Sequence, residues 1–212
     1  KHMANLEEFT TQQVKEKRVG NLKILFENKV ILMIIIMIYI CNISMFPLQA
    51  IIPLFVKNIF HGKFFDFATL QVIRSAGAFL GCLLVGIMLS RIALWKKVFS
   101  TQLITALFYL AFSLSKNAYS SSIFLGFLGF FSAMSSVYVF SLIQKISSRD
   151  SLSTVMPIVS FSITCSQPIA MLIFGALLTK ISFINLAIAY SIILIVTALI
   201  TLTLPEYRKV EG

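Results

Sequence analysis

The stretch VILMIIIMIYICNISMFPLQAIIPLFV, which runs from Val30 to Val56, decides the fold of this chain. It contains no charged residue, and it exceeds the about 20 helical residues needed to cross a hydrocarbon core of roughly 30 Å. Because it is longer than one straight crossing requires, it can tilt or bend. We therefore expect a transmembrane helix here.

The polar and aromatic side chains of this stretch are not scattered. Four of them follow one another at steps of three, four and three, on one helical face: Tyr39, Asn42, Phe46 and Gln49. Pro47 and Pro53 lie in the second half, and each proline removes a backbone donor, so that nearby carbonyls need partners from other helices or cavity water. The stretch therefore predicts a bent helix that faces a pore or cavity.

The composition of the whole chain agrees with a membrane protein. Of its 212 residues 58% are hydrophobic and 12% charged, with a mean hydropathy of +0.92, which no soluble globular domain averages. The net charge of +10 would suggest nucleic acid in a soluble protein. In a membrane protein the same excess is the bias that keeps positive loops inside, so we expect no nucleic-acid partner.

The chain divides into three parts. Residues 1–29 are polar and of mixed charge and predict a cytoplasmic linker, residues 30–204 predict an all-α domain of six transmembrane helices, and residues 205–212 predict a short cytoplasmic tail. The expected spans are about 30–56, 67–89, 98–114, 120–143, 154–179 and 184–204.

The distribution of Lys and Arg predicts the orientation of these spans. Six spans put both ends of the domain on one side, and 13 of the 18 Lys and Arg residues fall on that side, in the amino-terminal segment, two loops and the tail. The opposite side has four. Both termini are therefore predicted to be cytoplasmic.

The six spans differ in their polar content. The third and sixth carry mainly Ser and Thr, which can bond back to their own helix, and we expect these two spans at the periphery. The first, second, fourth and fifth carry amides, prolines, glycines and an arginine, and we expect them to face an interior. In the fifth span, Gln167 beside Pro168 predicts a local helix break.

Two of the interior spans carry small residues in a helical pattern. Gly77 and Gly81 form a Gly-x-x-x-Gly pair that permits close approach of another helix. In the fourth span, Gly129, Ser132 and Ser136 form a stripe that fits a packing surface and a cavity wall equally well.

Arg74 is the one charged residue inside a predicted span, and it shares a helical face with Gln71. An unpaired arginine at a helix centre costs about 2.5 to 3.5 kcal/mol on insertion scales. Two interpretations stay open: a functional residue that faces a cavity, and a side chain that snorkels to the interface or is structural. No Asp or Glu lies inside any predicted span, so a coupling carboxylate is not found there.

The sequence argues against an intramembrane enzyme. His2 and His61 both lie outside the spans, so neither can activate a serine within the membrane. Cys41, Cys82 and Cys165 lie in apolar runs without the spacing of a disulfide framework or a metal site. We expect no catalytic activity, no metal and no cofactor.

The loop between the second and third spans resembles a known signature. Gly86 is followed by Ser90 and Arg91 and then by a basic pair, Lys96 and Lys97. In major facilitator superfamily transporters a similar loop has a glycine, an acid, Arg or Lys, a second glycine and a basic pair. The resemblance implies that these five residues form a cytoplasmic gating loop. Because Ser90 replaces the acid, the salt bridge of that acid is not implied.

A second stretch carries the resemblance further. Gln144 and Lys145 lead through a polar loop with Arg149 into a helix that contains Pro168 and Gly175. This proline and glycine spacing is similar to the eleventh helix of the bacterial macrolide-efflux-type members, and the opening span with its two prolines is similar to their seventh. The resemblance covers about residues 20 to 205. It implies the carboxyl-terminal half of a twelve-helix fold.

In such folds two six-helix halves enclose a cavity near the bilayer midplane and rock against one another. The resemblance implies that one wall of the cavity is formed by eight side chains: Tyr39, Asn42, Phe46, Gln49, Gln71, Arg74, Ser132 and Ser136. It also implies proton-coupled efflux of a drug-like or small amphipathic solute by alternating access. The coupling carboxylate would then belong to the missing amino-terminal half.

One alternative stays open. The six-helix unit could be self-contained, acting as a homodimeric transporter or as a scaffold that transports nothing, and the first residue, Lys1, leaves both a tag remnant and a longer chain possible. The expected partners are the lipid bilayer, a small-molecule substrate, and the missing half or a second copy. The richness in Lys, Ile and Phe hints at a low-GC bacterium, and we expect the chain in the bacterial inner membrane.

Overall fold

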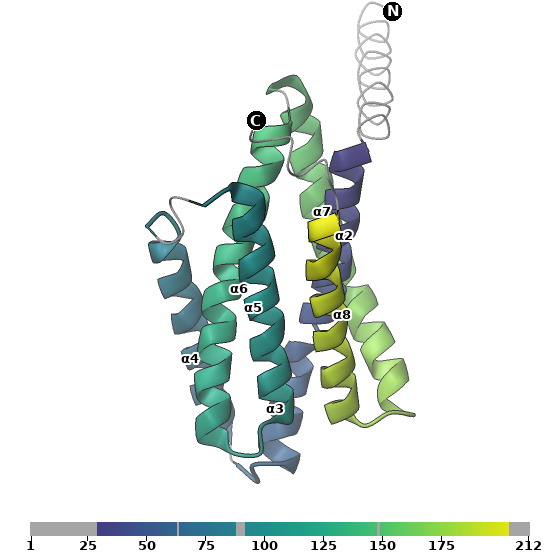
Figure 1. The fold of residues 1–212 in the computed structure, drawn as a ribbon. Coiled ribbons are helices and arrows are strands. Elements are labelled where there is room, and N and C mark those ends of the chain that lie inside the picture. The colour runs from purple at the N-terminus through teal and green to yellow at the C-terminus, as the bar shows by residue number, and fades with distance from the viewer. Residues whose placement is uncertain (1–28, 63, 88–91, 148, 204–212) are drawn as a thin grey trace, which may run out of the picture.

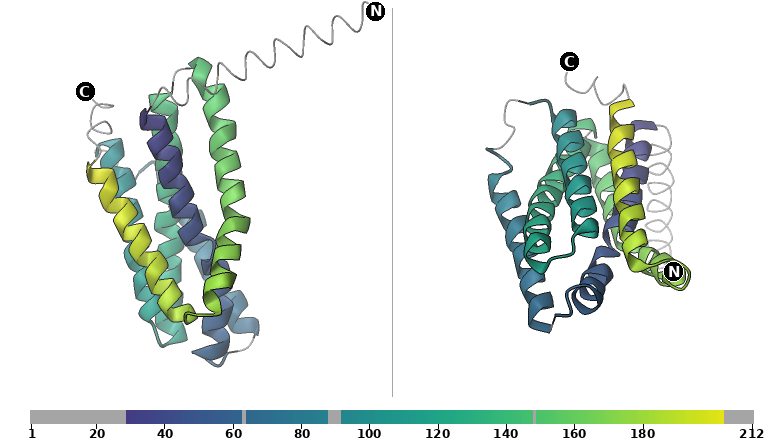
Figure 2. Two further views of the ribbon diagram at one scale, coloured as in Figure 1. Left: turned by 90° about the vertical axis from the view of Figure 1, so that its right-hand side faces the viewer. Right: turned by 60° about the horizontal axis from the view of Figure 1, so that its bottom comes forward.

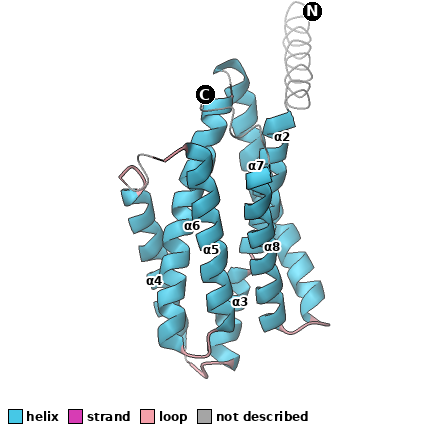
Figure 3. Ribbon diagram, viewed as in Figure 1, coloured by secondary structure: helices cyan, strands magenta, loops and turns pink. Residues whose placement is uncertain are grey.

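The computed structural model describes residues 29–62, 64–87, 92–147 and 149–203. Within these residues the fold is all-helical, and six apolar segments are long enough to cross a membrane, which confirms the predicted class (Figures 1 and 3). The predicted linker before residue 29, the tail, and the loop residues Ser90 and Arg91 lie outside the described residues.

The first span is built from two helices and each later span from one. In chain order the helices are α2 (Lys29–Met45), α3 (Leu48–Asn58), α4 (Phe64–Leu84), α5 (Leu94–Leu114), α6 (Ala118–Ile146), α7 (Arg149–Leu178) and α8 (Phe183–Thr203). α4 ends five residues before the predicted end of the second span. Gly86 therefore lies in a turn, where the N–H of Ile87 donates to the carbonyl oxygen of Leu84 at 3.1 Å.

The expected bend of the first span is found at Pro47. The proline has no N–H to donate to the preceding turn, and α2 ends at Met45 while α3 begins at Leu48. The main-chain N–H groups of Ala50 and Ile51 both donate to the carbonyl oxygen of Pro47 at 2.9 Å, which restarts the helix. Pro53 lies inside α3 without ending it.

The local break predicted beside Pro168 is wrong. α7 is helical from Arg149 to Leu178, with both Pro157 and Pro168 inside it. The Gln167 side chain is exposed on the surface of the described bundle, so it does not repair a broken turn from within the bundle as we had expected. A long helix tolerates a proline when the rest of its hydrogen-bond ladder is kept.

The helices pack in a fixed lateral order. α6 packs against α4 and α5, α5 against α8, α8 against α2, and α2 against α7, so that α4 and α7 lie at opposite edges of the bundle (Figures 1 and 2). α3 contacts α4 and α8 at the end opposite to the start of α2.

The pattern of helix contacts is unchanged when the first three spans are exchanged for the last three. The exchange replaces α2 by α6, α4 by α7, and α5 by α8, and it turns each of the five main helix contacts into another of the five or into itself. Because three spans are an odd number, the two units run through the membrane in opposite directions. The fold is therefore a pair of inverted three-span units in its packing pattern.

The backbones of α4 and α6 approach each other closely. A Cβ atom added to Gly77 would collide with the main-chain oxygen of Gly126, and one added to Gly81 would collide with that of Phe130. A Cβ added to Gly129 would collide with the main-chain oxygen of Arg74. The Gly-x-x-x-Gly prediction is confirmed, since only glycine lets the two backbones come this close.

Two clusters of buried side chains hold the bundle together, one toward each end. One contains Phe55, Phe112 and Tyr109, and the other contains Ile34, Val98, Met134 and related aliphatic residues. Phe55 packs on Phe112 with ring centroids 4.8 Å apart. The cavity described next is bounded by members of both clusters.

Candidate functional site

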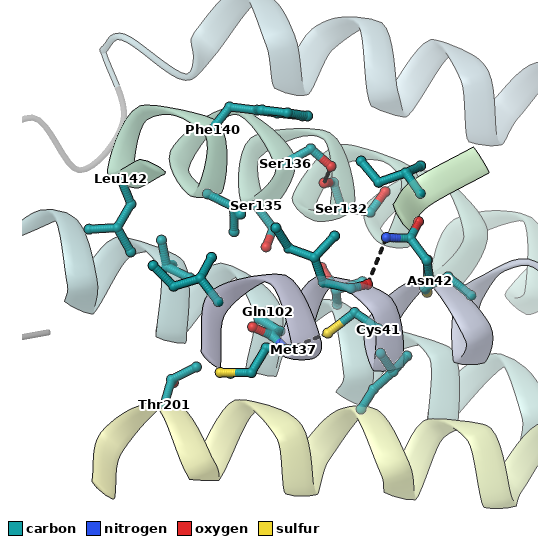
Figure 4. A pocket seen from close by; sticks show the side chains of 18 residues that line it. Met37, Cys41, Asn42, Gln102, Ser132, Ser135, Ser136, Phe140, Leu142 and Thr201 are labelled. Carbon is teal, nitrogen blue, oxygen red and sulfur yellow. Dashed lines mark hydrogen bonds between the residues drawn. The ribbon is translucent and has the colours of Figure 1, made fainter. Parts of the chain in front are cut away.

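A cavity of about 420 Å³ lies among α2, α5 and α6, with side chains from α7 and α8 completing its wall (Figure 4). This volume falls within the usual range of small-molecule pockets. Most of the wall is apolar. The polar members, among them one thiol, are Cys41, Asn42, Gln102, Thr105, Ser132, Ser135, Ser136 and Thr201.

Three hydroxyl groups of this wall are bonded to their own helices. Ser132 donates to the carbonyl oxygen of Gly129 at 2.9 Å, Ser136 donates to that of Ser132 at 3.0 Å, and Thr105 donates to that of Thr101 at 2.8 Å. The hydrogens of these three hydroxyls are thereby used, and their oxygens remain as acceptors for whatever enters the cavity.

The two amides of the wall differ in what they contact. Asn42 donates from its Nδ2 to the carbonyl oxygen of Ile38, one turn back on α2, at 2.8 Å. Gln102 on α5 donates from its Nε2 across the helix interface to the Sγ atom of Cys41, at 2.9 Å (Figure 4). The Gln102 side chain is 8% exposed. It is thus a buried amide that joins α5 to α2 at the edge of the cavity.

Three of the eight predicted cavity residues line this cavity: Asn42, Ser132 and Ser136. The small residues of the fourth span serve both as a packing surface and as a cavity wall. Gly129 packs on α4, while Ser132 and Ser136 line the cavity.

The other five predicted residues, Tyr39, Phe46, Gln49, Gln71 and Arg74, are not among the lining residues. For Phe46 and Gln49 the reason is the break at Pro47, since a single continuous face cannot pass through it. Tyr39 lies about 100° around the helix from Ile38 and about 60° from Asn42, outside the arc of the lining side chains of α2.

Gln71 and Arg74 are kept from the cavity by α6, which stands between α4 and α5. Both side chains are half-buried, and the Nε of Arg74 donates to the Oε1 of Gln71 at 3.1 Å. The guanidinium group therefore has a neutral partner on its own helix.

The expectation that the third and sixth spans are peripheral is wrong for their inner faces. α5 contributes Gln102 and Thr105 to the cavity, and α8 contributes Leu194 and Thr201. Sequence reasoning missed Gln102 because it weighed the third span by its Ser and Thr content, although Gln102 is the sole amide there. The outer face of α8 is apolar, with exposed residues that include Ile192, Ile193, Val196, Leu199 and Ile200.

The predicted gating residues lie at one end of the bundle where they are described. Gly86 is exposed with open space around it, and the Nζ of Lys96 lies 5.3 Å from the ring centroid of Trp95. The Nζ of Lys97 lies 5.6 Å from the ring centroid of Tyr138 on α6. The Tyr138 hydroxyl in turn donates to the main-chain oxygen of Val85, so α6 ties both ends of this loop.

Charge and metal ligands are missing from the described part of this site. The residues that line the cavity include no Asp, Glu, Lys, Arg or His. Among the described residues no group of three or more His, Cys, Asp or Glu side chains is arranged to hold a metal ion. No protein-family model matches the sequence, and no curated protein matches it.

Proposed function

We propose that this chain is the six-helix half of a secondary active transporter that exports an amphipathic solute by alternating access, driven by protons. The observation that carries the proposal is the cavity between α2 and α6, the first helices of the two three-span units, with polar side chains set in its apolar wall. Solute sites of transporters with inverted repeats lie at the interface of the repeats, near the bilayer midplane.

The exposed polar side chains of α7 support a second six-helix unit beside this one. Ser160, Thr164 and Gln167 are exposed on a helix that crosses the membrane, where a lipid-facing amide is costly. The outer face of α8 carries no such residues between Ile192 and Ile200. A covering unit on the α7 side, the missing half or a second copy, would remove this cost.

The proposed energy source also requires that unit. Proton coupling uses a carboxylate or imidazole within the membrane, and the six spans contain no Asp or Glu apart from Asp66 at the start of α4. We place the coupling carboxylate in the second unit. We further propose a bacterial inner membrane as the location, with both termini cytoplasmic, as the distribution of Lys and Arg favours.

The test is transport by the full-length protein in proteoliposomes with an imposed pH gradient. Two radiolabelled probes are used so that the result does not depend on the charge of the solute: neutral triphenylphosphine oxide and the cation methyltriphenylphosphonium. We expect at least one probe to accumulate, and an uncoupler to abolish the accumulation. Correctly inserted protein that moves neither probe would overturn the proposal and favour the scaffold alternative.

A further inference from the structure

The wall of the cavity discriminates by charge and by hydrogen bonding. Its polar groups are amides, hydroxyls and one thiol, and its described lining residues carry no charge. An ion that enters such a site loses its water without gaining a counter-charge, at a large cost in free energy. A neutral solute with an apolar body pays no such cost and buries its surface against the aliphatic wall.

Gln102 supplies a donor that such a solute can use. The hydroxyl hydrogens of Ser132, Ser136 and Thr105 are engaged by carbonyl oxygens of their own helices. Gln102 instead donates to the Sγ of Cys41, and a thiol sulfur is a weak acceptor. An oxygen acceptor on a bound solute forms the stronger bond, so exchange of partner is favourable.

We propose that the cavity binds an uncharged solute with an apolar body and one exposed hydrogen-bond acceptor oxygen, and that this oxygen replaces the Cys41 thiol as the partner of Gln102. The inference rests on the proposed function, because it takes the cavity to be the solute site of the transporter. It goes further by naming the class of solute and the residue that selects it.

Three probes of similar size test separately the two properties of the proposed solute, its lack of charge and its acceptor oxygen. Triphenylphosphine oxide is neutral with an acceptor oxygen, triphenylmethane is neutral without one, and methyltriphenylphosphonium is a cation without one. Equilibrium binding of each radiolabelled probe is measured on the full-length protein in nanodiscs, after subtraction of the partition into empty nanodiscs. We expect the oxide to bind about tenfold or more tightly than either of the others.

The variant that tests the donor is Gln102→Leu. It removes the amide while keeping an apolar side chain of similar size, and Gln144→Leu makes the same change at an exposed position at the end of α6, outside the cavity. We expect Gln102→Leu to weaken binding of the oxide about tenfold and to leave binding of triphenylmethane unchanged. A role of Gln102 in packing alone would weaken both probes equally, which would overturn the proposal.

A charge placed at the same position gives an opposite test. Gln102→Glu, measured at a pH high enough to ionise the buried carboxyl group, removes the donor and adds a negative charge, so the preference should change from the oxide to the phosphonium cation. A wild-type protein that already prefers the cation would overturn the inference and show that charge reaches the site from elsewhere.

The results can overturn this inference and the proposed function independently of each other. Selective oxide binding without transport of any probe would leave this inference standing and remove the proposed function. Transport of the cation with no binding of the oxide would do the reverse.

Discussion

The hydroxyl of Tyr138 on α6 donates a hydrogen bond of 2.8 Å to the main-chain oxygen of Val85, which lies just after the end of α4. The same aromatic ring lies beneath the Nζ of Lys97 near the start of α5. One side chain of α6 therefore contacts both ends of the loop that joins α4 to α5.

Tyr138→Phe isolates the hydrogen bond of this contact, because it keeps the ring beneath Lys97. Loss of one such bond to a main-chain carbonyl costs about 1 kcal/mol. We expect faster amide hydrogen exchange in residues 85–87 and 92–97, measured by mass spectrometry. The control is Tyr119→Phe, which removes a hydroxyl at the opposite end of the bundle. Tyr119 is 76% exposed, and its loss of the hydroxyl should leave exchange in this loop unchanged.

Gly77→Ala tests the seam between α4 and α6. The new methyl group would meet the main-chain oxygen of Gly126, and backbone cannot move aside as a flexible side chain can. We expect a loss of about 1 to 3 kcal/mol of stability, seen as a lower midpoint of thermal unfolding in detergent.

Gly175→Ala is the matched control for that change. A Cβ at Gly175 meets nothing within 4 Å, and alanine favours a helix over glycine by about 1 kcal/mol. Its midpoint should stay level or rise. Equal loss in both variants would mean that close approach is not what the seam requires.

Arg74→Ala should lower transport by the full-length protein severalfold and leave membrane insertion intact. Arg74 lies midway along an apolar helix long enough to cross a membrane, with the Gln71 amide as a neutral partner, and a charge kept in such a helix indicates a task. Insertion is measured by glycosylation mapping, and it should be at least as efficient as in the wild type. Unchanged transport would assign Arg74 to the snorkelled or structural interpretation.

Ser132→Leu should reduce transport of the accepted probe about tenfold, because the larger side chain fills part of the cavity. Ser122→Leu makes the same change on the same helix, and Ser122 does not line the cavity. The comparison is read as initial transport rate per inserted protein. Equal rates for the two variants would place the solute path elsewhere.

The predictable parts of this structure depended on local chemistry. A proline without an N–H locates the break at Pro47, and a Gly-x-x-x-Gly pair locates the seam at Gly77 and Gly81, because each effect arises within one or two turns of helix. The class followed from the length and apolarity of the spans.

The missed parts depended on which helix stands beside which. Gln102 faces the cavity because α5 lies between α6 and α8, and no pattern within α5 encodes its neighbours. Arg74 and Gln71 share a face as predicted, yet α6 separates that face from the cavity. A helical face can be found from spacing, whereas its partner depends on the packing of the whole bundle.

The reversible packing order has a consequence for any motion of this bundle. The exchange of the two three-span units maps the α5–α8 contact onto itself and maps every other main contact onto a different one. A dyad that exchanges the two units would therefore pass between α5 and α8, in the plane of the membrane. If the two units exchange conformations across this dyad, the two ends of the cavity exchange their environments while the packing pattern of the bundle is kept.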